Sequence, residues 1–95
     1  MTTANITSIN SSQNIDSGYN IYLVDVSNSD ITLVLPYITS DGYYFTFRRV
    51  DNTPANTLTI TGDNSSQKID NLASITLSGN TSISLVSYGG VWWRL

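Results

Sequence analysis

The 95-residue chain contains no cysteine, no histidine and no glutamate. Without cysteine, no disulfide can hold a small core together, which favours oligomerisation as a source of stability. Neither a cysteine nucleophile nor a histidine base is available for catalysis. The acidic residues are all aspartates, and most stand beside Asn, Ser, Thr or Gly, as in turns. We therefore predict that the protein is not an enzyme, has no catalytic residues and uses no cofactor.

Charge is also scarce: four Lys and Arg against seven Asp give a net charge of −3, with no basic run. This composition disfavours nucleic acid as a partner, because neutralising phosphates requires clustered Lys and Arg. No apolar stretch is long enough to cross a bilayer, so we expect no membrane partner. Asp63-Asn64 and Asp70-Asn71 offer oxygens that calcium accepts, but no loop gathers several carboxylates, and we predict no metal site.

Asn, Ser and Thr instead fill more than a third of the chain. Short segments of alternating apolar and polar residues recur between turns that contain Asp, Asn, Gly or Pro. This pattern predicts strands at 19–26, 31–35, 43–50, 57–61, 67–70, 74–78, 81–87 and 91–95. Strands at such spacing indicate an all-β fold, a single antiparallel β-sandwich that is jelly-roll-like and has about seven to nine short strands.

The connections and the amino-terminal segment give further expectations. Short motifs at 31–33, 58–60, 75–77 and 83–85 recur irregularly, and we interpret them as the ordinary strand pattern rather than a solenoid repeat. Gly79-Asn80 predicts a tight hairpin turn, because both residues accept positive φ. Residues 1–18 carry only isolated isoleucines. We predict that they form a polar arm, with room for one short strand, that adds little to the core of a sandwich domain at 19–95.

Residues 43–49, YYFTFRR, concentrate aromatic and basic side chains. Alternation assigns them to opposite faces of a strand: Tyr43, Phe45, Phe47 and Arg49 on one, and Tyr44, Thr46, Arg48 and Val50 on the other. Three roles are open for Arg48 and Arg49: an ion pair within the chain with Asp51 or Asp25, a pair between subunits, or a ligand contact. Because Arg49 shares a face with two phenylalanines, its charge must be neutralised or leave the core, which favours a subunit contact.

Trp92 and Trp93 alternate on the last expected strand, so one belongs to the core and the other to a subunit contact or an exposed surface. The candidate subunit interface comprises Tyr44, Arg48, Arg49, Trp92 and Trp93. Exposed aromatic rings also stack on sugars. Tyr43 and Tyr88, together with Tyr44 and one tryptophan, are therefore candidates for a glycan contact.

The order of several segments resembles a known type of domain. These segments are IYLVDVSNSDITLVLP, GYYFTFRRVD, NTLTITGD, QKIDNLASITLSG and TSISLVSYGGVWWRL, within residues 19–95. Their succession resembles a small all-β domain found at the carboxyl ends of phage tail-fibre proteins, proteins of large DNA viruses and bacterial collagen-like surface proteins. KIDN stands here where that family has IdG.

The resemblance implies a homotrimeric structural module without catalysis, located on a virion or an extracellular surface filament. In that role the chain would trimerise, cap or decorate a virion, a phage fibre or a surface filament, with other virion or fibre proteins as partners. The surface aromatics leave an alternative open, a carbohydrate-binding module that recognises a glycan receptor.

Overall fold

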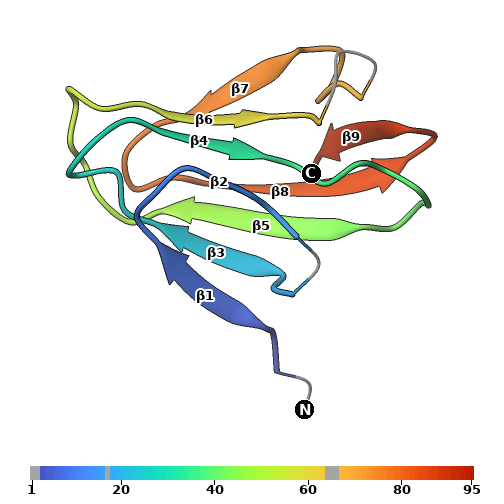
Figure 1. Ribbon diagram of the computed structural model, residues 1–95, viewed down its shortest axis with the longest axis horizontal. Coiled ribbons are helices and arrows are strands. Elements are labelled where there is room, and N and C mark those ends of the chain that lie inside the picture. The colour runs from blue at the N-terminus through green and yellow to red at the C-terminus, as the bar shows by residue number, and fades with distance from the viewer. Residues whose placement is uncertain (1–2, 17, 64–66) are drawn as a thin grey trace.

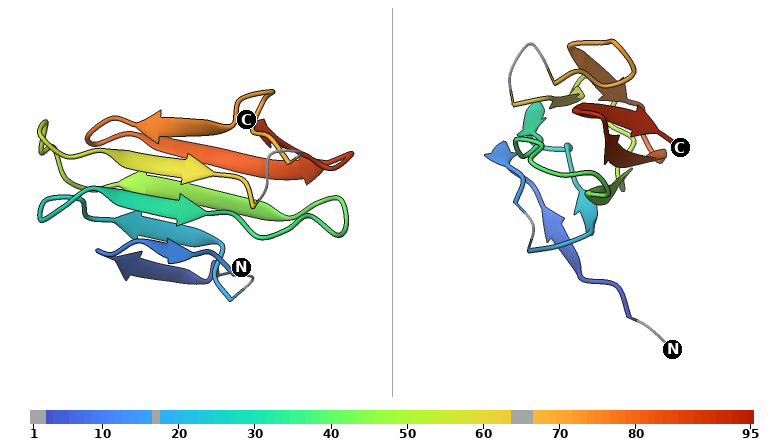
Figure 2. Two further views of the ribbon diagram at one scale, coloured as in Figure 1. Left: turned by 45° about the horizontal axis from the view of Figure 1, so that its top comes forward. Right: turned by 90° about the vertical axis from the view of Figure 1, so that its right-hand side faces the viewer.

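The computed structural model describes residues 3–16, 18–63 and 67–95. In these residues the chain forms nine strands in two sheets and no helix (Figure 1), which confirms the all-β class and the expected number of strands. The five-stranded sheet runs in the order β1 (Ile6–Ile9), β3 (Ile21–Val24), β5 (Tyr44–Arg49), β8 (Ser82–Tyr88) and β9 (Val91–Arg94). The four-stranded sheet runs in the order β2 (Gln13–Asn14), β4 (Ile31–Val34), β6 (Leu58–Thr61) and β7 (Ser74–Leu77). The sheets face each other as two layers of a sandwich-like molecule (Figure 2).

The first six strands alternate between the two sheets, so the chain winds around the core in successive coils. β1, β3 and β5 are parallel neighbours in one sheet, as are β2, β4 and β6 in the other. The expectation of an antiparallel sandwich is therefore wrong for these six strands, and both sheets are mixed. Alternation in a sequence indicates which side chains point inward, whereas it carries no information on which strands become neighbours.

The last three strands, β7, β8 and β9, make antiparallel pairs. β8 and β9 form a hairpin through Gly89 and Gly90, whose φ angles of 64° and 78° are costly for other residues. The hairpin predicted at Gly79-Asn80 is wrong, because β7 pairs with β6 whereas β8 pairs with β5 and β9. Asn80 has the expected positive φ of 57°, but its turn carries the chain from one sheet to the other.

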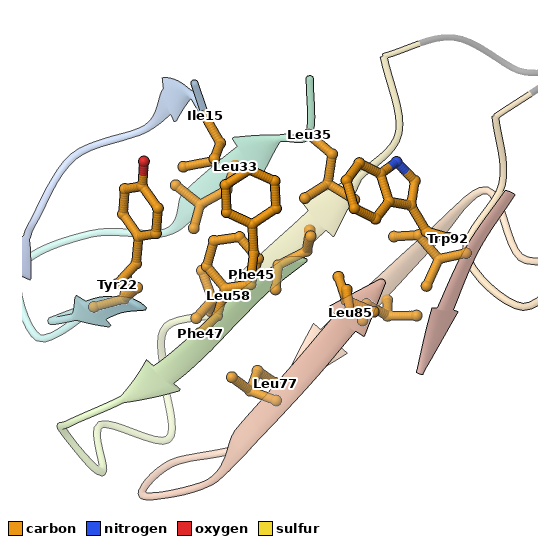
Figure 3. Packing of buried hydrophobic residues seen from close by; sticks show 14 of the residues in the cluster. Ile15, Tyr22, Leu33, Leu35, Phe45, Phe47, Leu58, Leu77, Leu85 and Trp92 are labelled. Carbon is orange, nitrogen blue, oxygen red and sulfur yellow. The ribbon is translucent and has the colours of Figure 1, made fainter. Parts of the chain in front are cut away.

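The core lies between the sheets and contains the inward-facing side chains of both (Figure 3). Aromatic rings fill its middle: Phe47 stacks on Tyr22 at a centroid distance of 5.4 Å, and Phe45 meets Trp92 at 5.8 Å. Aliphatic residues of the four-stranded sheet cover them, namely Ile31, Leu33, Leu58, Ile60, Ile75 and Leu77. This packing follows the period-two alternation from which the strands were predicted.

Residues 3–16 belong to the sandwich and are not a separate polar arm. β1 pairs in parallel with β3, and β2 pairs with β4. Ile15 is 3% exposed and joins the core, and Ile9 packs against it. The expectation that this segment adds little to the core is therefore wrong for these residues, because an isolated isoleucine can be buried while its polar neighbours pair along a sheet edge. Residues 1–2 and 17 lie outside the described chain.

The strand expected at 67–70 is replaced by isolated bridges from Ile69 to Leu72 and to Trp92. Gln67, only 6% exposed, pairs through its side chain instead. Its Oε1 accepts the Ile38 N–H at 2.9 Å, and its Nε2 donates to the Ile38 carbonyl at 3.2 Å. A side-chain amide thus takes the place of a backbone ladder at this edge.

Candidate interaction surfaces and a buried ion pair

Strand β5 presents different side chains to the interior and to solvent, as its alternation predicts. Phe45, Phe47 and Arg49 are buried, whereas Tyr44 and Arg48 are exposed. The two adjacent arginines therefore occupy different environments, one inside the sandwich and one on its surface.

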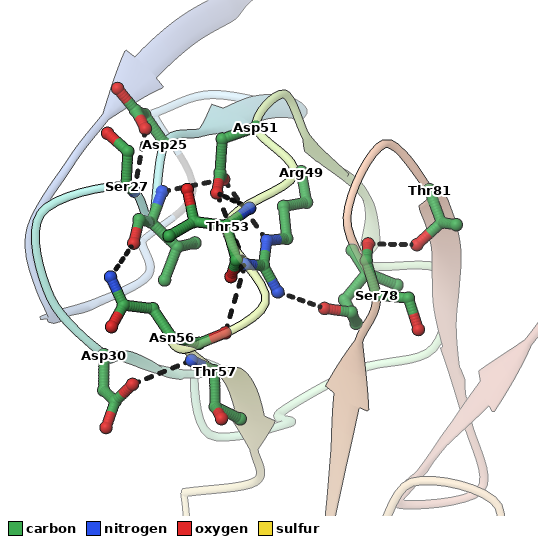
Figure 4. Close-up of polar contacts among 12 residues, drawn as sticks. Asp25, Ser27, Asp30, Arg49, Asp51, Thr53, Asn56, Thr57, Ser78 and Thr81 are labelled. Atoms are coloured by element: carbon green, nitrogen blue, oxygen red, sulfur yellow. Dashed lines mark hydrogen bonds and ion pairs between the residues drawn. The ribbon is translucent and has the colours of Figure 1, made fainter.

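Arg49 lies at the carboxyl end of β5, where its guanidinium closes one end of the sandwich (Figure 4). Its Nε and Nη2 donate to the two carboxylate oxygens of Asp51, at 3.2 and 3.3 Å. Its Nη1 donates to the Leu77 carbonyl at 3.1 Å, and Nη2 also donates to the carbonyls of Thr53 and Asn56 at 2.8 and 3.1 Å. The side chain thereby joins β5 to β7 of the opposite sheet and to the loop at 51–57.

Asp51 is held from several sides. Its Oδ1 accepts the Val26 N–H at 2.9 Å, and its Oδ2 accepts the Thr53 N–H at 3.1 Å. The hydrogen bonds from Arg49 lower the pKa of Asp51 far below its ordinary value; burial opposes this shift, and the bonds from Val26 and Thr53 add to it. The carboxylate therefore stays ionised and cancels the charge of the guanidinium.

Two residues of the subunit interface predicted from the sequence lie in the interior. Of the roles left open for Arg49, the ion pair with Asp51 is the one that forms, and the inference of a subunit contact is wrong. The physical reason is local: the chain turns after β5 and brings the Asp51 carboxylate back to the guanidinium. Trp92 is 0% exposed and packs on Phe45, so it is the core tryptophan and is unavailable to a partner.

The other three predicted interface residues, Tyr44, Arg48 and Trp93, share the outer side of the five-stranded sheet. Tyr44 lies opposite Val86, and Val86 lies opposite Trp93, so these three form a row across β5, β8 and β9. Arg48 lies in a parallel row, opposite Leu23 of β3. We call this surface the five-strand face; it comprises Ile6, Ile21, Leu23, Tyr44, Arg48, Val86 and Trp93, together with the hydroxyl residues Ser8, Thr46, Ser82 and Ser84.

The two sheets differ in what they turn to solvent. On the five-strand face, Ile6, Tyr44 and Trp93 are 53%, 43% and 41% exposed. The outer side of the four-stranded sheet, which we call the four-strand face, is rich in hydroxyls and carries Thr32, Val34, Thr59, Thr61, Ser74 and Thr76. A sheet with one solvated side normally carries polar residues there. The four-strand face follows this rule, whereas the five-strand face mixes apolar and aromatic side chains with the hydroxyls of Ser8, Thr46, Ser82 and Ser84.

A surface pocket of about 520 Å³ lies at the other end of β5, away from Arg49. Four tyrosines line it, Tyr19, Tyr37, Tyr43 and Tyr44, and we call it the tyrosine pocket. Of the two residues predicted as glycan contacts, Tyr43 lines this pocket. Tyr88, 67% exposed at the β8–β9 hairpin, does not line it.

Sequence reasoning missed Tyr19 and Tyr37 as members of this pocket. Tyr19 lies far from Tyr43 along the chain, and the parallel pairing of β3 with β5 brings them together. Tyr37 lies six residues before Tyr43, in the connection between β4 and β5. A usable signal was present in their positions, since both tyrosines stand at strand ends, just before β3 and just after β4.

No group of three or more His, Cys, Asp or Glu side chains that could hold a metal ion occurs within residues 3–16, 18–63 and 67–95. Asp70, one of the aspartates considered for calcium, forms an ion pair with Arg94, whose Nε lies 2.6 Å from Oδ2. The hydrogen bond from Arg94 lowers the pKa of Asp70. Asn64, the neighbour of Asp63, lies outside the described residues.

No protein-family model matches the chain, and a search of curated proteins finds no significant match. In the part of the chain that the structure describes, no helix is long and apolar enough to cross a membrane. The five-strand face and the tyrosine pocket are therefore the features from which a function can be inferred.

Proposed function

We propose that this chain is a non-catalytic structural module that assembles as a homotrimer through its five-strand face. In this role it trimerises, caps or decorates a virion, a phage fibre or an extracellular surface filament, with other virion or fibre proteins as partners. The observation that carries the proposal is the exposure of large apolar and aromatic side chains, Ile6, Tyr44 and Trp93, on the five-strand face, whereas the four-strand face carries mainly hydroxyl side chains. The trimer is the state implied by the resemblance to carboxyl-terminal domains of fibre and collagen-like proteins.

Covering the five-strand face would stabilise the assembly through apolar burial. Removing apolar surface from water contributes about 25 cal/mol per Å². A stable interface covers roughly 800 Å² on each partner. The molecule measures 37 × 35 × 21 Å, so the broad side of one sheet offers a surface of that order. Assembly would also compensate for the small core of a cysteine-free domain.

Arg48 supplies a polar contact on the same surface. Across the described residues its guanidinium has no carboxylate partner, whereas Arg49 and Arg94 are each paired. The chain carries a net charge of −3, so a neighbouring copy offers several carboxylates. Arginine suits interfaces because its planar fork can bind a carboxylate through two hydrogen bonds. In the proposed trimer, Arg48 pairs with an aspartate of the adjacent copy, beside Tyr44 and Trp93.

Sedimentation equilibrium of outward-facing variants tests the proposal. Tyr44→Ser and Trp93→Ser, singly and combined, remove aromatic surface from the five-strand face and leave the core in place. We expect the wild type to sediment as a trimer and the double variant to dissociate, because aromatic residues commonly dominate interface energies. Tyr37→Ser is the matched control: Tyr37 is 55% exposed but lies outside the five-strand face, so this variant should stay trimeric.

Far-UV circular dichroism shows whether each variant keeps its strands. If the folded double variant assembles as strongly as the wild type, the five-strand face is not the interface. Dissociation of the Tyr37→Ser control to the same extent would likewise remove the special role of Tyr44 and Trp93.

A further inference from the structure

We infer that the tyrosine pocket binds a neutral saccharide. This function goes beyond the proposed assembly and does not depend on it. Its basis is a cavity of about 520 Å³ whose lining combines four tyrosines with Asp16 and Asn20. A cavity of this size falls within the range of small-molecule sites, which pair an apolar lining with a few polar groups.

Separate turns of the winding chain build the pocket. Tyr19 and Asn20 precede β3, Tyr37 follows β4, and Tyr43 and Tyr44 stand at the start of β5. The pocket therefore sits at the amino ends of two parallel neighbours, and the sheet holds its members at a fixed distance from one another. Sites built on strand ends of a rigid scaffold need little reorganisation on binding.

The hydroxyl groups of two tyrosines are anchored. The Tyr44 hydroxyl donates to Ser84 Oγ at 3.3 Å and accepts from Thr46 Oγ1 at 3.3 Å. The Tyr43 hydroxyl is hydrogen-bonded to Thr39 Oγ1. These bonds fix the positions of both hydroxyl groups.

The pocket tyrosines are not stacked on one another in the described chain. In the described chain no ring contact joins one pocket tyrosine to another, and Tyr19 meets Tyr22 edge-on at a centroid distance of 6.1 Å. Ile15 and Phe45, each 3% exposed, contribute apolar surface to the lining. The lining of the pocket thus combines aromatic and aliphatic side chains.

Asp16 and Asn20 add hydrogen-bonding capacity. Asp16 Oδ1 accepts the Gly18 N–H at 2.8 Å, which fixes the carboxylate, and lone pairs remain on both oxygens. Asn20 Nδ2 makes a long contact of 3.4 Å with the Tyr44 carbonyl, and its amide can both donate and accept. A sugar ring matches this set, because its C–H faces are apolar and its hydroxyls both donate and accept hydrogen bonds.

Charge and exposure exclude the competing ligand classes. The residues that line the pocket include one carboxylate and no cation, and the chain carries a net charge of −3, so an anionic ligand is repelled. A quaternary ammonium ion would be attracted by tyrosine rings, but this attraction is strong only in a desolvated cage. Tyr19 and Tyr37 are 44% and 55% exposed, so a cation here would keep much of its water.

The experiment is a screen of the wild-type protein on an array of neutral glycans, followed by calorimetric titration with the best glycan. Tyr37→Ala and Asp16→Asn should each weaken binding about tenfold or more, through a lost ring contact and a lost acceptor charge. Tyr88→Ala is the matched control, because Tyr88 is more exposed than any tyrosine of the pocket but lies outside it. It should bind as the wild type does.

Choline and N-acetylneuraminic acid serve as cationic and anionic probes in the same titration, and neither should bind comparably. Several results would overturn the inference: no neutral glycan retained on the array, choline bound in preference to every glycan, or Tyr88→Ala weakened as much as Tyr37→Ala. Sedimentation of Tyr37→Ala keeps this test apart from the assembly proposal, since a variant that loses sugar and remains a trimer shows that the two functions are separate.

Discussion

Arg49 is the residue on which the closed end of the sandwich depends most. Its removal leaves the Asp51 carboxylate, 11% exposed, and three backbone carbonyls without their donor. Breaking a buried ion pair costs about 3–5 kcal/mol, so Arg49→Ala should lower the free energy of unfolding by about that amount. Arg48→Ala, at an exposed site, should stay within about 0.5 kcal/mol. Urea denaturation at low protein concentration compares the two, and equal losses would contradict the buried role of Arg49.

The lowered pKa of Asp51 makes the free energy of unfolding depend on pH. Because hydrogen bonds from Arg49 lower its folded pKa below the unfolded value of about 3.9, the unfolded state takes up the proton first as the pH falls. The stabilisation is therefore complete above about pH 5 and declines as the pH drops through 4 toward the folded pKa. Asp51→Asn should be less stable at neutral pH and should show a shallower decline, because only the part due to Asp70 remains. Urea midpoints between pH 2 and 7 test it, and a variant with the wild-type slope would contradict the assignment.

Position 79 requires glycine because a larger side chain would clash with Asn52, and not because of its φ angle. A Cβ at this position would lie 2.4 Å from Asn52 Oδ1 and 2.8 Å from the Asn52 Cα, closer than such atoms approach. Gly79→Ala must therefore push the β7–β8 turn away from the loop that follows β5, and we expect it to cost about 1–3 kcal/mol. Thermal unfolding measures the loss. Ser78→Ala, one residue earlier and exposed, is the control and should unfold like the wild type.

At the scale of strands, the sequence predicts where a strand lies and which of its sides faces inward, but not which strands pair. The alternation of residues 31–35 and 74–78 indicates β4 and β7 with the correct inward sides, because period two is a property of each strand alone. It cannot indicate that β4 lies parallel to β6, since pairing depends on how distant coils stack. The prediction of a hairpin at Gly79-Asn80 is wrong for the same reason. These two residues suit a hairpin turn, but the strands on either side of them, β7 and β8, belong to different sheets.

For the candidate sites too, alternation predicts the side of the strand on which a residue lies and does not predict its partners. Alternation alone assigns Tyr44 and Arg48 to the outer side of β5 and Arg49 to the inner side. The partner of Arg49 depends on how the chain turns after the strand, and the grouping of Tyr19 and Tyr37 with Tyr43 depends on the winding. The Arg49–Asp51 pair requires the conformation of a turn that alternation does not describe, and the approach of Tyr19 to Tyr43 requires the positions of segments that are separate in the sequence.

The β1–β2 coil should be essential to stability. It covers the edges of both sheets and buries Ile15. Loss of one buried Ile costs about 2–5 kcal/mol, so deleting residues 1–16 should lower the melting temperature by at least about 10 °C. Deleting residues 1–4, which precede β1, is the control and should change little. Differential scanning calorimetry compares the two, and an unchanged melting temperature after the longer deletion would return this segment to the role of a dispensable arm.

Across the whole molecule, three regions differ in position. The Arg49 cluster closes the carboxyl ends of β3 and β5, and the tyrosine pocket lies at their amino ends. The five-strand face lies between them on the outer side of the same sheet and includes Tyr44, which also lines the pocket. Assembly through this face would bring the pockets of neighbouring copies toward one another, so that a repeating glycan could engage more than one of them.

The central claim is that the chain assembles through its five-strand face, and the solution mass tests it most directly. Multi-angle light scattering during size-exclusion chromatography, repeated over a dilution series at micromolar concentrations, gives this mass without assumptions about shape. The account predicts a single species of three times the 10.4 kDa chain mass that persists on dilution. A species of 10.4 kDa throughout the series would contradict it, because a stable monomer would leave the apolar side chains of the five-strand face exposed to water.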